Sequence, residues 1–180
     1  MAKIEGSWSG MRRYLEQEML AESLRGRVRW QCVSFPDMDE LCMFSLLIDG
    51  ATVKRFSWET VNSYFIAQGM KSEEAAHPRG MREYWKEFWN LLTQTPMQER
   101  TEYTDEEFCE ALAAYRNQPI GESLQSENPL ERMFALLDRR VGKRRLAALE
   151  AQSAAWPAWL QSLYHLRRAA EGMDVAGDAR

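Results

Sequence analysis

The chain has 180 residues, a length that suits one domain or a small pair of domains and is enough to bury a hydrophobic core. Hydrophobic residues make up 45% of the sequence and aromatic residues 11%, which excludes an intrinsically disordered chain. No apolar run is long enough for a membrane span and the N-terminal segment lacks the apolar core of a secretory signal, so the sequence predicts a cytoplasmic protein. The net charge of −4 argues against a dedicated nucleic-acid binder.

The first third of the chain predicts a helix followed by a strand. Met11, Leu15 and Met19 recur at helical spacing, which predicts a helix over residues 9–24 that ends before the glycine at position 26. The next stretch, RVRWQCVSF, alternates polar and apolar residues, as a half-buried strand does. A loop is predicted in FPDMDE, because proline removes a backbone donor and acidic residues follow it.

A β-hairpin is predicted in the segment LCMFSLLIDGATVKRF. Asp49 and Gly50 form the dipeptide that a two-residue type I′ turn prefers, because both central residues need a positive φ. The expected register places three pairs opposite each other: Ile48 with Ala51, Leu46 with Val53, and Phe44 with Arg55. The other face of the sheet is then expected to carry Met43, Leu47 and Phe56, which a second layer should cover.

Two helices are predicted on either side of a polar break, KSEEAAHPRG. Ser57 is the expected N-cap of the first and Gly69 its stop. The second carries an apolar stripe of Met81, Trp85, Phe88, Trp89 and Leu92. Because this spacing is typical of a face packed in a core, we expect both tryptophans of the stripe to be buried. Seven tryptophans are many for one core, however, and any exposed ones predict a protein-binding surface.

The remainder of the chain predicts a series of helices. Thr104 and Glu107 have the spacing of a capping box at the start of one of them. Another has Asn128 as its N-cap, continues to Val141 and stops at Gly142. Two further helices are predicted: a short one to Leu149, and a last one over residues 157–172 that buries Leu160, Leu163 and Tyr164.

These elements predict an α+β fold with a helix, a three-stranded antiparallel sheet and a helix, followed by a mostly helical C-terminal half. We expect residues 1–172 to form a single integrated domain, with an N-terminal unit at 8–70 and a helical half at 80–172. Residues 173–180 are expected to be a flexible tail. The helical half is expected to cover the second face of the sheet.

The order of elements over residues 8–70 resembles the double-stranded RNA-binding domain, in which two helices pack on one face of a three-stranded sheet. That family binds phosphates through lysines at the start of the second helix. The corresponding segment here, SWETVNSY, has no lysine and one glutamate, so the element that would bind RNA is missing.

Over nearly all of residues 8–168, the sequence resembles a family of uncharacterised bacterial hypothetical proteins. The segments that carry the resemblance are WSGMRRYLEQEMLAESLRGRV, YRNQPI, NPLERMFALLDRRVGKRRL and WPAWLQSLYHLR. The resemblance implies a bacterial cytosolic protein, and it implies no activity and no catalytic residue.

A basic segment, DRRVGKRRL, lies between two predicted helices. Its cations, here called the basic elbow, are Arg139, Arg140, Lys143, Arg144 and Arg145. The first two would lie in the last turn of a helix, where cations are favoured. The other three would lie in the first turn of the next helix, where positive charge and free N–H groups attract anions. The elbow is therefore either a weak site for nucleic acid or phosphate, or a surface paired with acids of the fold such as those of residues 99–110.

No catalytic residue, metal site or cofactor is predicted. Cys32, Cys42 and Cys109 lack the spacing of a zinc site and are expected to be reduced structural thiols. His77 lies in the polar break and His165 lies opposite the apolar stripe of the last helix, so both are expected to face solvent.

These features favour a non-catalytic cytosolic adaptor that binds another protein, without binding to a membrane. The alternative is a weak binder of nucleic acid or of a phosphate ligand through the basic elbow. An enzyme whose site is assembled from distant segments is the third class of function.

Overall fold

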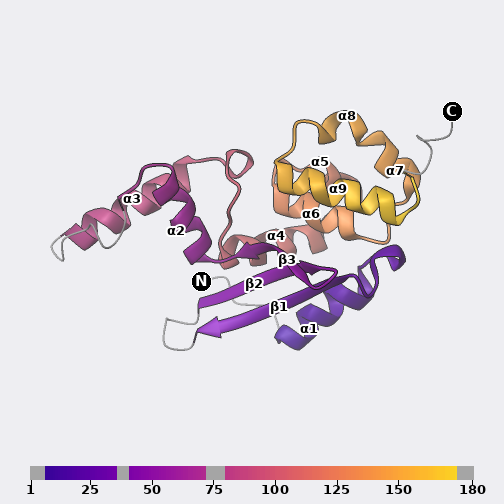
Figure 1. Ribbon diagram of the computed structural model, residues 1–180, viewed down its shortest axis with the longest axis horizontal. Coiled ribbons are helices and arrows are strands. Elements are labelled where there is room, and N and C mark those ends of the chain that lie inside the picture. The colour runs from indigo at the N-terminus through magenta and orange to yellow at the C-terminus, as the bar shows by residue number, and fades with distance from the viewer. Residues whose placement is uncertain (1–6, 36–40, 72–79, 174–180) are drawn as a thin grey trace.

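The computed structural model describes residues 7–35, 41–71 and 80–173. A three-stranded antiparallel sheet, β1 (Val28–Phe35), β2 (Leu41–Ile48) and β3 (Ala51–Phe56), is ordered β1-β2-β3. Figure 1 shows the helices that follow residue 118 gathered on one side of the molecule, and the helices of residues 58–67 and 81–94 as a separate pair on the other. The predicted α+β class, with a helical C-terminal half, is confirmed.

The first helix is shorter than the sequence predicts. It comprises α1 (Trp8–Arg13) and a π-helical turn, η1 (Tyr14–Glu18), and is followed only by a short 3₁₀ turn, η2 (Glu22–Leu24). The prediction of one helix over 9–24 is wrong because residues 19–21 pair with residues 137–139. The Ala21 amide donates to the Leu137 carbonyl at 2.9 Å, and the Arg139 amide donates to the Met19 carbonyl at 2.8 Å.

The hairpin turn is confirmed, and its register is only partly as predicted. Asp49 has φ 51° and Gly50 φ 85°, as a type I′ turn requires. Ile48 faces Ala51 as expected, but a β-bulge on β3, opposite the step from Leu46 to Leu47 of β2, shifts the pairing by one residue. The observed pairs beyond the bulge are Leu46 with Lys54 and Phe44 with Phe56, so the predicted Leu46–Val53 and Phe44–Arg55 pairs are wrong. The extra residue, Val53, is 48% exposed.

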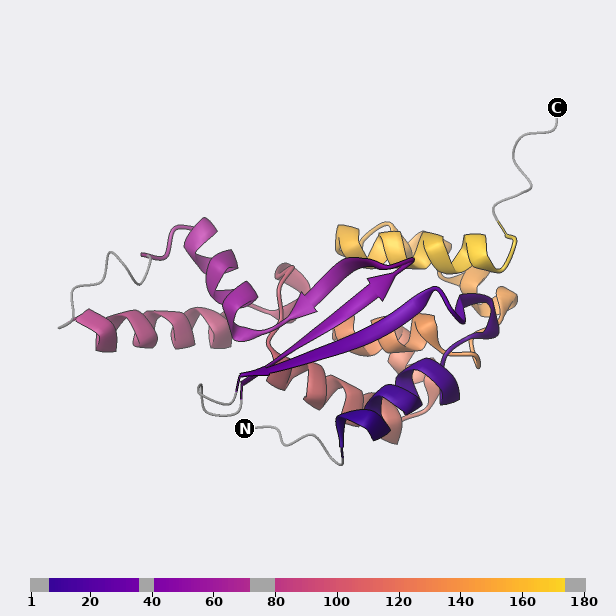
Figure 2. The same cartoon turned by 60° about the horizontal axis from the view of Figure 1, so that its bottom comes forward.

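The main core lies on the face of the sheet that carries Trp30, Phe44 and Phe56. The Phe108 ring lies 4.7 Å from Phe44 and 4.9 Å from Phe56. Phe134 lies 6.2 Å from Trp30. The helices that carry Phe108 and Phe134 therefore pack on this face, behind the sheet in Figure 2. The predictions that Phe56 would lie on the other face with Met43 and Leu47, and that the helical half would pack there, are wrong because the bulge turns Phe56 inward.

The second predicted helix does not pack on the sheet. α2 (Trp58–Ala67) begins at Ser57, whose hydroxyl accepts from the Thr60 amide at 3.3 Å, and the chain turns at Gly69 with φ 107°. Both predicted ends of this helix are confirmed. α2 packs against α3 (Met81–Gln94) around a separate apolar cluster of Val61, Phe65, Met70, Tyr84 and Phe88. This α2–α3 hairpin stands apart from the sheet in Figure 1, unlike the helices of a double-stranded RNA-binding domain.

The C-terminal half contains the remaining helices in the described part of the chain. They are η5 (Met97–Glu99), α4 (Asp105–Asn117), α5 (Ile120–Gln125), α6 (Pro129–Leu137), α7 (Lys143–Ala148), α8 (Glu150–Ser153) and α9 (Ala158–Ala170). The capping box of Thr104 and Glu107 is confirmed, as is the N-cap at Asn128. The apolar stripe of α9 is buried as predicted. None of the helices in the described residues has the length and apolarity that a membrane crossing requires.

Candidate functional site

The basic elbow is built around a buried carboxylate. α6 ends at Leu137 and not at Val141, because Asp138 adopts an extended conformation and its backbone pairs with Leu20. Asp138 is 1% exposed; its Oδ1 accepts from the Arg140 amide at 2.6 Å and its Oδ2 from the Arg140 Nε at 2.9 Å. The Tyr115 hydroxyl donates to the same Oδ2. The prediction that Arg139 and Arg140 lie in the last turn of a helix is therefore wrong.

Hydrogen bonding to Asp138 raises the pKa of the Arg140 guanidinium. The Asp138 carboxylate thus holds the Arg140 side chain in place and fixes the direction of the chain as it leaves α6. Arg140 also donates through Nη2 to the Tyr115 hydroxyl at 3.1 Å. One cation of the elbow is consequently a structural group.

The other cations of the elbow are exposed at its surface. Lys143, Arg144 and Arg145 form the first turn of α7, as predicted. Arg145 donates to the Arg140 carbonyl at 2.8 Å, which ties it back to the elbow. Arg139, Lys143 and Arg144 are exposed to solvent. A short helix with three exposed cations attracts anions in general, and selects none by geometry.

The acidic segment expected to pair with the elbow makes its contacts elsewhere. Glu102 pairs with Lys54 at 2.8 Å, Glu107 pairs with Arg100, and the Asp105 carboxylate accepts from the Cys42 amide at 3.1 Å. Within residues 7–35, 41–71 and 80–173, the acid that pairs with the elbow is Asp138, which lies in the basic segment itself. Whether the elbow binds an external anion stays a prediction.

Trp85 and Trp89 are exposed on α3, contrary to the expectation that they lie in the core. They are 43% and 50% exposed, whereas Tyr84 and Phe88 on the same helix are buried. α3 packs on α2 through its Tyr84 and Phe88 side, so the tryptophans lie at the edge of the contact. The sequence periodicity correctly predicts the apolar side of α3. Only part of that side is covered, because α2 is the helix that packs against it.

Trp58 extends these two residues into one surface. Its ring lies 4.8 Å from Trp89 in an edge-to-face arrangement and 5.3 Å from the buried Phe88 ring. Trp85 contacts the Phe88 ring at 5.8 Å, also edge to face. Trp58, Trp85 and Trp89, here called the aromatic face, are therefore held by ring contacts, which fixes them before any partner arrives.

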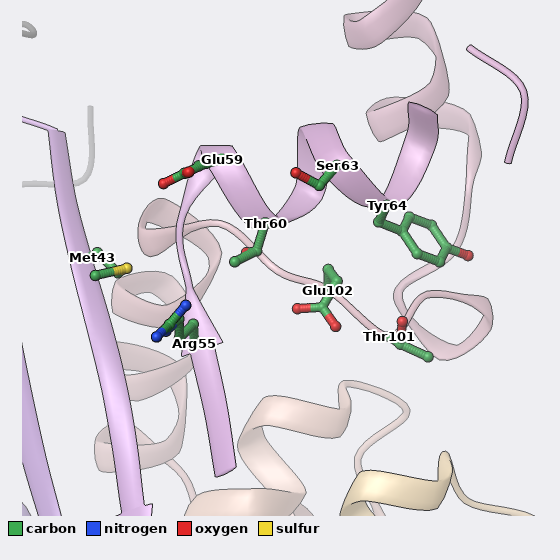
Figure 3. Close-up of a pocket in the computed structure, with 8 residues that line it drawn as sticks. All are labelled: Met43, Arg55, Glu59, Thr60, Ser63, Tyr64, Thr101 and Glu102. Carbon is green, nitrogen blue, oxygen red and sulfur yellow. The ribbon is translucent and has the colours of Figure 1, made fainter. Parts of the chain in front are cut away.

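A polar pocket of about 510 Å³ lies on the other side of α2. Figure 3 shows its lining of Met43, Arg55, Glu59, Thr60, Ser63, Tyr64, Thr101 and Glu102. Glu102 is already bound to Lys54, and the Tyr64 hydroxyl donates to the Glu99 carbonyl at 3.3 Å. The lining offers hydroxyls, carboxylates and the exposed guanidinium of Arg55, and it includes no histidine or cysteine.

The three cysteines are free, as predicted. Burial raises the pKa of the Cys32 and Cys109 thiols to about 12. His165 is exposed as expected, and His77 lies outside the described residues. The described residues include no group of histidines, cysteines and carboxylates placed to hold a metal ion.

The thiols of Cys32 and Cys109 are expected to react slowly in the folded protein. A pKa near 12 leaves roughly 1,000-fold less thiolate than an ordinary cysteine has at mildly alkaline pH. Labelling with an aromatic disulfide reagent should therefore be slow in buffer and fast in guanidinium chloride. Equal rates in the two solvents for these two cysteines, identified by peptide mapping, would contradict this prediction.

Comparison with known proteins gives a family and no closer relative. Neither the curated proteins nor the solved structures include a match to the chain. The model of the SF0329 protein family matches residues 7–168, from α1 into α9, and so includes the sheet, the aromatic face and the basic elbow. The chain belongs to the SF0329 protein family.

Proposed function

We propose that this protein is a non-catalytic adaptor of the bacterial cytoplasm that binds another protein through the aromatic face. The observation that carries the proposal is the exposure of Trp85 and Trp89 on a helical hairpin that stands apart from the sheet. Tryptophan is the residue most enriched among the side chains that dominate binding energy at protein interfaces.

The geometry of the aromatic face supports this role. Exposed tryptophans are unfavourable in water, and these lie together and not singly, with Trp58 packed against Trp89. Because ring contacts already hold them, a partner would gain apolar contact without ordering flexible side chains.

The state of the reactive side chains supports a role without catalysis. The thiols of Cys32 and Cys109 have raised pKa values, which disfavours the thiolate that a nucleophile needs. His165 is exposed on α9, where its ring contacts that of Tyr164 at 5.5 Å. The lining residues of the pocket in Figure 3 include hydroxyls and two carboxylates, of which Glu102 is paired with Lys54.

A photo-crosslinking experiment tests the proposal directly. A photoreactive amino acid at Thr93, one turn after Trp89 and exposed, should yield a discrete crosslinked protein in bacterial cells. The same amino acid at Gln152, exposed on α8, serves as the control and should not yield that product. A crosslink pattern that is the same from both positions, or the absence of a product from Thr93, would count against the aromatic face as a docking surface.

The exposure of Arg139, Lys143 and Arg144 favours a second candidate, a weak binder of nucleic acid or of a phosphate ligand. An electrophoretic titration at low and high salt separates the two functions. If the elbow contacts phosphates, affinity should fall steeply with salt and collapse in Lys143→Glu/Arg144→Glu, because released counterions drive such binding. We expect no binding at low salt, and a salt-dependent complex that the double variant loses would establish the second candidate.

A further inference from the structure

Two cations border the aromatic face along α3. Arg82 lies three residues before Trp85, and Lys86 lies three residues before Trp89. Residues at this spacing are neighbours on a helix surface. Arg82 and Lys86 are both exposed. Trp85 and Trp89 therefore form one row along α3, and Arg82 and Lys86 form a second row beside it. In each row the two residues are one helical turn apart.

The carboxylates of α3 lie on another side of the helix. Glu83 lies two residues before Trp85 and Glu87 two residues before Trp89, which places each about 200° around the helix axis from its tryptophan. The edge of the aromatic face is therefore positive, and the acidic edge of α3 points away from it.

α2 adds no acidic group to this edge. Glu59 follows Trp58 in the sequence, but it lines the pocket of Figure 3 together with Arg55. That pocket lies on the side of α2 opposite Val61, the buried residue that faces α3. The remaining charged residue near the end of α2 among the described residues is Lys71, which is also basic.

Arg82 and Lys86 are available to a partner. Within the described ranges 7–35, 41–71 and 80–173, neither forms an ion pair or a side-chain hydrogen bond. Several cations of the main body are instead paired with a carboxylate, namely Lys54, Arg100, Arg140 and Arg167. Among the residues that the structure describes, no carboxylate forms an ion pair with either of the two cations beside the aromatic face.

We infer that the aromatic face binds an acidic amphipathic helix. This inference rests on the proposed function and specifies the chemistry of the partner. Apolar side chains one turn apart on the partner helix match the spacing of Trp85 and Trp89, and carboxylates along its edge match Arg82 and Lys86. Two helices that pack side by side present such rows to each other over several turns. Charge complementarity of this kind selects the partner, while the rings supply most of the affinity.

Two peptide pools test the inference. Both place leucine and phenylalanine at one helical face; the outward positions of one pool are aspartate and glutamate, and those of the other are lysine and arginine. The immobilised protein should retain the acidic pool roughly tenfold better than the basic pool at low salt, with less difference at high salt. Trp85→Ser/Trp89→Ser should abolish retention of the acidic pool.

Charge reversal provides the decisive comparison. Arg82→Glu/Lys86→Glu should reverse the preference, so that the basic pool is retained better. Lys143→Glu/Arg144→Glu makes the same change in net charge on the basic elbow and should leave the preference unaltered. Retention that follows the elbow variant and not the α3 variant would overturn the inference.

Further outcomes are also decisive. Equal, tryptophan-dependent retention of the two pools would overturn the acidic partner and leave the proposed function standing. Retention of neither pool would overturn the inference that the partner is a helix. The proposed function would then be tested separately by the crosslinking experiment at Thr93. Tryptophan-dependent binding of a labelled single-stranded oligonucleotide, in the absence of peptide binding, would assign the face to nucleic acid.

Discussion

Replacing Asp138 with alanine is expected to lower the free energy of unfolding by about 3 kcal/mol. The substitution removes the acceptor for the Arg140 amide and for the Tyr115 hydroxyl, and leaves both donors without their partner. Each buried donor left unsatisfied costs about 1–3 kcal/mol. The Arg140 guanidinium is half exposed and can turn to water, so its loss adds little to the total. Chemical denaturation of the purified protein measures this change.

Two further variants show whether the loss comes from the Asp138 network. Tyr115→Phe removes the donor that Asp138→Ala leaves unpaired, so the double variant should lose less stability than the sum of the two single variants, by about 1 kcal/mol or more. Glu18→Ala removes a carboxylate from an exposed pair with Arg13 and should change stability by less than about 0.5 kcal/mol. A loss below about 1 kcal/mol for Asp138→Ala would show that the elbow is not held by this carboxylate.

Replacing both exposed tryptophans with serine is expected to weaken partner binding by about 100-fold or more. Tryptophans at the centre of an interface commonly contribute about 2 kcal/mol each to binding. The same double variant, Trp85→Ser/Trp89→Ser, should remain folded, because both rings are about half exposed and the buried centre of the hairpin is Phe65 and Phe88. Once crosslinking has identified the partner, calorimetric titration of the purified partner into each variant measures the affinity. Thermal unfolding of each variant measures its stability.

Two control variants distinguish a loss of binding from partial unfolding of the α2–α3 hairpin. Trp89→Phe keeps an aromatic ring beside Trp58 and should retain most of the affinity. Phe88→Ala removes a fully buried ring and should destabilise the hairpin by about 3–5 kcal/mol. If the two serine substitutions behave like Phe88→Ala in unfolding, the tryptophans act in folding and not in docking.

Local features of the fold were predictable from the sequence because their causes are local. The turn at Asp49-Gly50 follows from the φ values that those two residues tolerate. The capping box of Thr104 and Glu107 follows from hydrogen bonds between residues three apart. The N-cap at Ser57 has the same kind of cause. Each of these required no knowledge of what packs against it.

Pairing between distant segments explains the main errors. Residues 19–21 continue a helical pattern, yet they pair with residues 137–139, and this contact ends both the first helix and α6 early. The bulge opposite Leu46 and Leu47 changes which side chains of β3 face the core, and the hairpin dipeptide carries no information on it. That residues 1–172 form a single integrated domain stays a prediction.

The candidate sites were predictable in part. The basic elbow is visible in the sequence, and Asp138, the one acid inside it, was the signal for internal pairing. Periodicity identified the apolar side of α3 but could not show that α2 is its main helical partner, which is why Trp85 and Trp89 are exposed. The excess of tryptophans was the signal that some would lie at the surface.

The most direct test of the account compares two pairs of exposed apolar residues in cells, by crosslinking from Thr93. Val33 and Val53 on the sheet are 45% and 48% exposed, close to the values of Trp85 and Trp89. Trp85→Ser/Trp89→Ser should abolish the crosslinked product, and Val33→Ser/Val53→Ser should leave its yield unchanged. An unchanged product in the tryptophan variant, or an equal loss in both variants, would contradict the assignment of the aromatic face as the docking surface.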